Sequence, residues 1–174
     1  MVPPPRGGDV LLEVRGVTAM FTPFTPSMPG IPVIVLDLED GREFTLYNVP
    51  YEIVRAINKL QASGPDTLGE RETIFDVIVD MREFIGGIGA RLERVVVDEI
   101  DYATALYTAK VFFDLGGIYM TRRMVPSHAI FLALLFGRPI YVSKRLVDEQ
   151  EMYGKREGAA VYAGEAEEED EEEF

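Results

Sequence analysis

The chain has 174 residues, of which 47% are hydrophobic, enough for one domain that buries roughly two-thirds of its unfolded surface. It contains no cysteine, which excludes disulfides, thiolate metal sites and cysteine nucleophiles. The longest apolar run, residues 129–137, is far shorter than the ~20 residues that cross a bilayer, so we expect a cytoplasmic protein without a membrane-spanning segment.

The first fifty residues predict a flexible lead followed by three strands. Residues 1–8, rich in proline and glycine, lack the apolar core of a signal peptide and are expected to be flexible. Segments rich in apolar and β-branched residues predict strands at residues 10–21, 31–38 and 42–49. Prolines interrupt the chain between the first two strands, and Asp40-Gly41 between the last two is typical of a tight hairpin turn.

Two amphipathic helices are predicted next. Pro50 begins the first, which ends before residue 63 and has its apolar residues at helical spacing. The second is predicted from Thr73 to Ile85 and is ended by Gly86-Gly87. Its buried stripe is expected to consist of Ile74, Val77, Ile78 and Met81.

The second half of the chain predicts a hairpin-rich sheet and a buried helix. Strands are expected at residues 91–99, 102–113, 117–123 and 139–143, and a short final helix at residues 144–153. The helix from Pro126 to Phe136 has no polar residue after position 128, so it should be buried, and Gly137 ends it. This order predicts an α+β domain over residues 9–152, in which a mostly antiparallel or mixed sheet of hairpins packs against three to four helices.

The net charge of −13 is concentrated at the C-terminus. Residues 165–174 hold eight acidic side chains, which leaves −5 for the rest of the chain. Like charges at this density repel one another, so residues 153–174 are expected to form a linker and a disordered acidic tail. The tail either keeps the protein in solution or imitates a phosphate chain and binds a basic groove or a basic partner.

The start of the helix at residue 126 is the best candidate anion site. Arg122 and Arg123 precede a helix N-terminus, whose free N–H groups favour phosphate, and an arginine pair adds bidentate phosphate binding. Ser127 adjoins His128, the only histidine of the chain and the side-chain type that exchanges protons near neutral pH. Alternatively, His128 is structural, one arginine points to solvent, and the other pairs with a carboxylate such as Glu52.

Three carboxylates are candidate catalytic or metal-binding groups. Asp76 and Asp80 lie four residues apart in the predicted second helix, so they would be neighbours that could share a divalent cation, magnesium or manganese. Glu52 lies in the first turn of the first helix and could act as a catalytic or metal-binding carboxylate. In the simpler interpretation, the two aspartates belong to a solvated helix face, and the helix dipole alone explains Glu52.

Several segments of the chain follow, in the same order, the motifs of a known family. The run RRMVPSHAIFLALLFGRPIYVS at residues 122–143 is similar to a Pro-Ser-Asp-Ala-Ile segment followed by Ala-Leu and Pro-Ile-Tyr-Val. Residues 49–52 are similar to Gly-Pro-Phe-Glu, and residues 89–97 to Gly-Ala-Arg-Val-Glu-Arg-Val-Val. In these motifs the chain resembles the bifunctional nuclease domain family across residues 9–152. The resemblance implies an α+β fold and a nuclease activity on RNA and DNA.

The sequence departs from the family pattern at three polar positions. His128 stands where the family has Asp, Val125 where it usually has Arg, and Phe75 where it often has His, whereas Asp76 agrees with the pattern. If the family activity runs through these groups, then either His128 acts in place of the usual aspartate or the activity has been lost.

Two functions follow as hypotheses. The first is a nuclease that hydrolyses RNA or DNA phosphodiesters with a divalent metal, in which the candidate residues named above meet in one cleft. The second is a non-catalytic oligomeric scaffold that keeps the fold without the chemistry. The negative charge of the chain favours the second, since nucleic-acid binders normally present a basic surface. A homo-oligomer is expected in either case, with the apolar loop Phe21–Phe24 offering a contact surface.

Overall fold

The computed structural model describes residues 8–23, 26–27, 30–61 and 71–169, with side chains described as far as residue 156. A seven-stranded mixed sheet has the strand order β3-β2-β1-β7-β4-β5-β6. The strands are β1 (Leu11–Phe21), β2 (Pro32–Leu38), β3 (Glu43–Leu46), β4 (Leu92–Asp101), β5 (Leu106–Asp114), β6 (Tyr119–Met124) and β7 (Ile140–Ser143). The predicted α+β class with a mixed sheet of hairpins is therefore confirmed.

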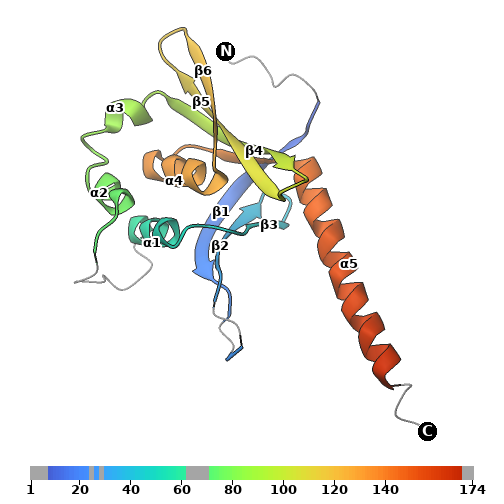
Figure 1. Cartoon of the computed structure of the whole chain (residues 1–174). Helices are drawn as coiled ribbons and strands as arrows, with labels where there is room; N and C mark the ends of the chain where they lie inside the picture. The colour runs from blue at the N-terminus through green and yellow to red at the C-terminus, as the bar shows by residue number, and fades with distance from the viewer. Residues whose placement is uncertain (1–7, 24–25, 28–29, 62–70, 170–174) are drawn as a thin grey trace.

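Helices cover one side of this sheet (Figure 1). They are α1 (Tyr51–Leu60), α2 (Ile74–Asp80), α3 (Gly86–Gly89), α4 (Pro126–Phe136) and α5 (Lys144–Glu169). The first four lie on that side, whereas α5 leaves the end of the sheet and projects away from the body (Figure 1). Among the described residues, no helix combines the length and the apolar character that crossing a membrane requires.

The short strand β7 joins two antiparallel halves of the sheet. It pairs antiparallel with β1 and parallel with β4, so the β1–β2–β3 meander lies on one side of it and the β4–β5–β6 meander on the other. The core lies between the sheet and the helices. Side chains that are fully inaccessible include Ile34, Leu36, Val95, Val97 and Val111 from the sheet and Ile53, Ile57 and Ile130 from the helices.

Helix α4 has the bounds that the sequence predicts. Pro126 occupies its first turn, where the missing N–H of proline costs no hydrogen bond. Gly137 ends it in the left-handed conformation at φ 63°, and the N–H of Arg138 then donates to the carbonyl of Ala133 at 2.8 Å. Because both faces of the helix are apolar, it can pack between the sheet and helix α1.

The second predicted helix is shorter than expected, and most of the residues expected on its buried face are exposed. The helix α2 ends at Asp80, and after a turn the short helix α3 follows. Three of the four residues of the predicted buried stripe, Ile74, Val77 and Met81, are exposed, whereas Ile78 packs against the core as expected. Asp76 and Val79, which were not expected inside, are buried. Helical spacing alone cannot tell which of two partly apolar faces packs inward. The inward face of α2 carries Asp76, which pairs with Arg55, beside Phe75, Ile78 and Val79.

The C-terminal helix α5 covers the outer edge of strand β3. The side-chain amide of Gln150 accepts a hydrogen bond from the N–H of Thr45 and donates one to its carbonyl, both at 2.8 Å. The guanidinium of Arg42 donates to Asp148 at 2.7 Å and lies 3.2 Å from Glu151. At Thr45 the edge of the sheet is therefore paired by a side chain of α5.

Helix α5 also extends beyond its predicted end near Tyr153. It runs to Glu169, so the expected linker at residues 154–164 is helical, since alanine and glutamate are strong helix formers that offset the glycines of this segment. Residues 170–174 of the acidic tail, residues 1–7 of the lead and Phe24 of the apolar loop lie outside the described residues.

Docking of helix α5 should weaken in acid. Hydrogen bonds from Lys144 and Arg42 lower the pKa of Asp148, and hydrogen bonds from Arg42 lower the pKa of Asp40. A carboxylate whose folded-state pKa is lowered stabilises the fold above its ordinary pKa, and the stabilisation is lost as pH falls through the folded-state value, here below about pH 4. Urea unfolding followed by circular dichroism at pH 7 and pH 3 should show a smaller acid-induced loss in Arg42→Ala than in the wild type. An equal loss in both proteins would mean that these ion pairs do not contribute.

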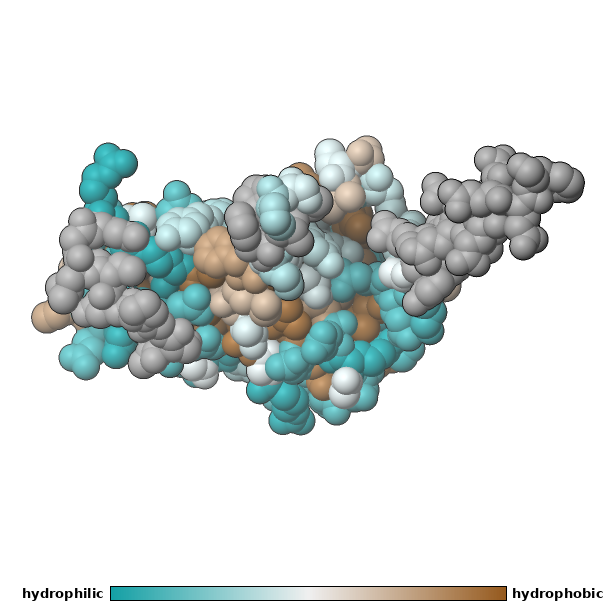
Figure 2. Space-filling view, turned by 90° about the horizontal axis from the view of Figure 1, so that it is seen from below, coloured by the Kyte–Doolittle hydropathy of each residue, from teal (hydrophilic) through white to brown (hydrophobic). Residues whose placement is uncertain are grey.

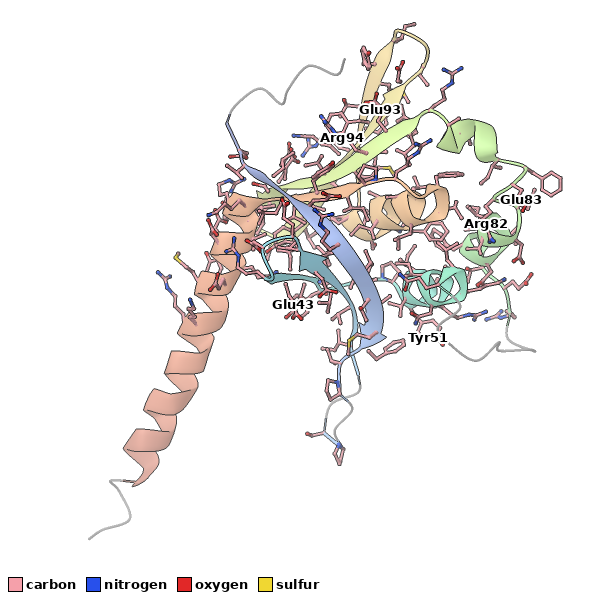
Figure 3. All side chains as sticks on the ribbon, turned by 180° about the vertical axis from the view of Figure 1, so that it is seen from behind. Glu43, Tyr51, Arg82, Glu83, Glu93 and Arg94 are labelled. Carbon is pink, nitrogen blue, oxygen red and sulfur yellow. The ribbon has the colours of Figure 1, made fainter. Side chains whose placement is uncertain are left out.

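An exposed apolar patch lies at the end of the β1–β2 hairpin. Phe21 is exposed, and its ring centroid lies 5.6 Å from that of Tyr51 in the first turn of α1. Figure 2 shows hydrophobic surface gathered in the middle of the face seen from below, with hydrophilic residues around it. Tyr51 is seen beside the end of β1 in Figure 3. Met20, the residue before Phe21 in β1, and Ile31, the residue before β2, are also exposed.

Candidate site at the α2–α4 junction

The imidazole of His128 packs against an aromatic side chain from helix α2. His128 lies in the first turn of α4 and is half-buried. Its ring meets Phe75 edge to face, with centroids 5.3 Å apart and an interplanar angle of 72°. Phe75 makes a similar contact with Phe131, one turn further along α4, at 5.6 Å. The contact brings the only imidazole of the chain next to helix α2, at the residue beside Asp76.

Ser127 contributes a buried hydroxyl to the same helix start. Its side chain is 3% exposed, and its Oγ has no hydrogen-bond partner among the described residues. Leaving a hydroxyl buried without a partner costs about 1–3 kcal/mol, so such a group is either a local defect or a donor kept for something that binds. Ser127 adjoins His128 in the sequence, but its hydroxyl is buried within the helix start.

Asp76 is a structural anchor of helix α2. Its carboxylate is 2% exposed and accepts hydrogen bonds from the N–H of Thr73 at 2.8 Å and from the Thr73 hydroxyl at 3.1 Å. The guanidinium of Arg55 on helix α1 lies 3.5 Å from the same oxygen. One turn later, Lys59 of α1 pairs with Asp80 of α2 at 3.1 Å. The two aspartates thus connect α2 to α1 through two ion pairs.

This pairing does not fit a divalent cation shared by Asp76 and Asp80. Magnesium and manganese prefer several oxygen ligands, and here each carboxylate faces a basic side chain instead. Within the described part of the chain, no group of three or more histidine, aspartate or glutamate side chains could hold a metal ion. The reaction proposed for this junction therefore does not use a metal ion.

The two arginines expected to act as a pair lie on opposite faces of strand β6. Arg122 is opposite Val111 on β5, whose side chain is in the core, so Arg122 belongs to the helix-covered face. Arg123 is opposite Lys110 on the other face and pairs with Glu99 at 2.7 Å, a different carboxylate from the expected Glu52. Arg122 is exposed and has no ion pair with the described residues. Of the two arginines expected to bind phosphate together, only Arg122 therefore remains a candidate.

The partner of Arg123 belongs to a charged network on the uncovered face of the sheet. Lys110 pairs with Asp98 at 2.8 Å and with Glu99 at 3.1 Å, and Arg123 adds a second cation to Glu99. The hydrogen bond from Lys110 lowers the pKa of Glu99 and keeps it ionised. These four charges therefore neutralise one another.

Glu52 is exposed in the first turn of α1, with no hydrogen bond or ion pair to the described residues. The structure thus places Asp76 and His128 on two helices in contact through Phe75, but it does not show the full set of candidates in one cleft. A shallow cavity of about 320 Å³ lies elsewhere, between the start of β1 and helix α5. It is lined by Asp9, Val10 and the charged residues of the first turns of α5.

Sequence reasoning missed the role of Arg55. The signal was present, because Arg55 and Lys59 repeat the four-residue spacing of Asp76 and Asp80, as expected of two helices that run side by side. No pattern in the sequence indicated the contact of Phe75 with His128, because the spacing of apolar residues within a helix does not show which other helix it packs against.

A family model described as bifunctional nuclease domain matches residues 65–155, slightly more than half of the chain. No curated protein matches the chain. Of the three positions at which the resemblance implied a departure, Phe75 and His128 contact each other directly, and Val125 precedes the first turn of α4. The departures are therefore concentrated at the α2–α4 junction.

Proposed function

Because the chain belongs to the bifunctional nuclease domain family, we propose that it binds and hydrolyses phosphodiesters of RNA or DNA at the α2–α4 junction. Family membership supports the class of reaction. One observation supports the location: the contact between His128 and Phe75 brings the only imidazole of the chain to the helix that carries the Asp76 of the family pattern.

In this proposal, each residue of the junction has a separate task. His128 accepts or donates the proton that moves during cleavage. The exposed guanidinium of Arg122 and the backbone N–H groups at the N-terminus of α4 hold phosphate oxygens, and the buried Ser127 supports that helix start. Asp76, already bound by Arg55 and Thr73, positions α2 and does not touch the substrate. Glu52 is the carboxylate that remains free to act on a substrate.

A non-catalytic interaction protein is the second candidate, and the same junction favours it. By the resemblance described above, the family has Asp at position 128 and often has His at position 75, whereas this chain packs the imidazole of His128 against the ring of Phe75. The net charge of −13 also opposes the binding of a polyanion. Under this candidate the fold and the packing of α2 on α4 are kept, while cleavage is lost.

A cleavage assay with matched variants separates the two candidates. Purified protein is incubated with labelled single- and double-stranded RNA and DNA, with and without magnesium or manganese. Under the nuclease proposal, His128→Ala and Arg122→Ala each lower the cleavage rate at least about tenfold. Arg123→Ala, on the same strand but the opposite face, serves as the control and keeps the wild-type rate.

Two outcomes would contradict the nuclease proposal. A folded wild-type protein that cuts none of the substrates under any condition would favour the interaction protein. Cleavage that persists unchanged in His128→Ala would place the activity at another site or in a contaminant.

A further inference from the structure

Strand β6 forms an open edge of the sheet. It is the last strand in the order, and among the described residues it pairs only with β5 (Figure 1). The other edge, β3, is occupied at Thr45, where the side chain of Gln150 bonds both backbone groups. No described side chain bonds the backbone of β6 in this way. An edge of this kind presents backbone N–H and C=O groups in the geometry that a further strand bonds.

The turn between β5 and β6 shows which residues of β6 point their backbone groups at the open edge. The N–H of Leu115 donates to the carbonyl of Ile118 at 2.9 Å across a two-residue turn whose glycines both have positive φ, so these two residues form a hydrogen-bonded pair. Hydrogen-bonded and non-hydrogen-bonded pairs alternate along an antiparallel ladder, and the register of β5 against β6 has no shift. The backbone groups of Tyr119, Thr121 and Arg123 therefore point away from β5.

Strand β6 lacks most of the features that keep an edge strand from pairing. Residues 119–124 contain no proline, and the pairing of β6 with β5 has no bulge. Residues 115–125 contain two arginines and no acidic side chain, a local charge of +2 in a chain of −13. One of these arginines, Arg123, is already paired with Glu99. Two copies can therefore approach along β6 without the repulsion between their acidic surfaces.

We propose that β6 pairs antiparallel with β6 of a second copy of this chain, about a two-fold axis at Thr121, so that the two sheets join into one. In this register the residues with outward backbone groups face one another, Thr121 opposite Thr121 and Tyr119 opposite Arg123. Each of them bonds the second copy through both its N–H and its C=O. The axis is perpendicular to the sheet, so each face of one copy continues into the same face of the other.

The side chains of β6 fit this register. On the uncovered face of the sheet, the guanidinium of Arg123, held by Glu99 at 2.7 Å, lies opposite the ring of Tyr119 of the second copy, where a cation–π contact forms. On the helix-covered face, Arg122 lies opposite Met120 of the second copy. An axis at Arg122 instead places two like charges directly opposite each other, which destabilises a pair of strands, and it pairs fewer residues of β6.

A second copy is favoured over an unrelated peptide as the occupant of this edge. Strand β6 of each copy is already extended and held by β5, so pairing does not pay the entropy of ordering a disordered segment. Its outward groups, its aromatic ring and its cation also match those of the same strand turned by the two-fold axis. The proposal does not depend on the proposed function, because it is tested without a substrate.

Sedimentation of the full chain over a range of concentrations tests the proposal. The wild type is expected to form a dimer. Thr121→Lys places two ammonium groups opposite each other at the axis and should raise the dissociation constant at least about tenfold. Thr104→Lys, the same change at an exposed residue of the β4–β5 turn, is the control and should leave the dimer intact. A wild type that stays monomeric at high concentration, or equal weakening by the two variants, would overturn the proposal.

Amide hydrogen exchange, followed by NMR on the wild type, distinguishes pairing through β6 from another contact between copies. The N–H groups of Tyr119, Thr121 and Arg123 bond the second copy only in the dimer, so their exchange should slow at least about tenfold from dilute to concentrated protein. The two residues between them bond β5 in the monomer as well, and their exchange should change less. Unchanged exchange at the three outward N–H groups, with new protection around Phe21, would assign self-association to the hairpin patch and refute the proposal.

Discussion

Arg55→Ala should destabilise the folded chain by about 2–4 kcal/mol, as measured by urea unfolding. The carboxylate of Asp76 is 2% exposed, and the Arg55 guanidinium, 3.5 Å away, is the cation that compensates it. Without the guanidinium a charge remains buried with only the N–H and hydroxyl of Thr73 to stabilise it. Desolvation of that charge is the main cost, and the residual hydrogen bonds keep it below the full penalty for an isolated ion.

Lys59→Ala is the matched control for this change. Lys59 is on the same helix, four residues later, and pairs with Asp80 on the same partner helix at 3.1 Å. Both side chains of this ion pair are in contact with water, so the loss of Lys59 should cost less than about 1 kcal/mol. A second substitution, Asp76→Asn, should restore part of the stability of Arg55→Ala because it removes the unpaired charge. Equal effects of Arg55→Ala and Lys59→Ala would show that the buried pair contributes no more than the exposed one.

Gly89→Ala should destabilise the fold by about 1–3 kcal/mol, the usual cost of overpacking a core. A Cβ at position 89 would overlap the ring of Phe136, the last residue of helix α4. The carbonyl of Gly89 also accepts hydrogen bonds from the guanidinium of Arg138, at 2.9 and 3.2 Å, so the backbone cannot move away freely. Thermal unfolding followed by circular dichroism measures the effect.

Gly87→Ala provides the control, since a Cβ at position 87 would meet no atom within 4 Å. This change within the short helix α3 should be neutral or stabilise by up to about 1 kcal/mol, because alanine loses less backbone freedom than glycine on folding. In a Phe136→Ala background, Gly89→Ala should lose most of its cost, as expected when two residues share one space. A cost that persists in that background would assign the effect to the backbone of α3.

The elements whose apolar residues lie clearly on one face, or on all faces, could be predicted from the sequence. Helix α4 is apolar throughout and bounded by Pro126 and Gly137, so its limits and its burial both follow from local chemistry. The turn at Asp40-Gly41 also follows from local chemistry, since Gly41 adopts φ 84°, which glycine reaches without strain. The predicted strand at residues 102–113 begins only at Leu106, because the turn between β4 and β5 takes the residues before it.

The candidate site could be predicted only in part. The sequence identified His128, Ser127 and Asp76 as unusual residues, and these three are at or next to the junction of two helices. The expected arginine pair overlooked that neighbouring side chains of a strand point to opposite faces. The register of β5 against β6 shows that Arg122 is the one that shares a face with the helices. The partners of Asp76 and Arg123 come from segments far apart in the chain.

The sequence by itself determined the fold class, the buried helix α4 and the identity of the polar residues around its start. These follow from hydrophobic patterning and from the backbone restrictions of proline and glycine, which act within a few residues. Only the tertiary structure decided that α2 turns Asp76 inward and Ile74 and Val77 outward. In that orientation Asp76 meets Arg55 of α1, and Phe75 and Ile78 pack on the core. These partners lie far away in the chain, so the spacing of residues within α2 does not show them.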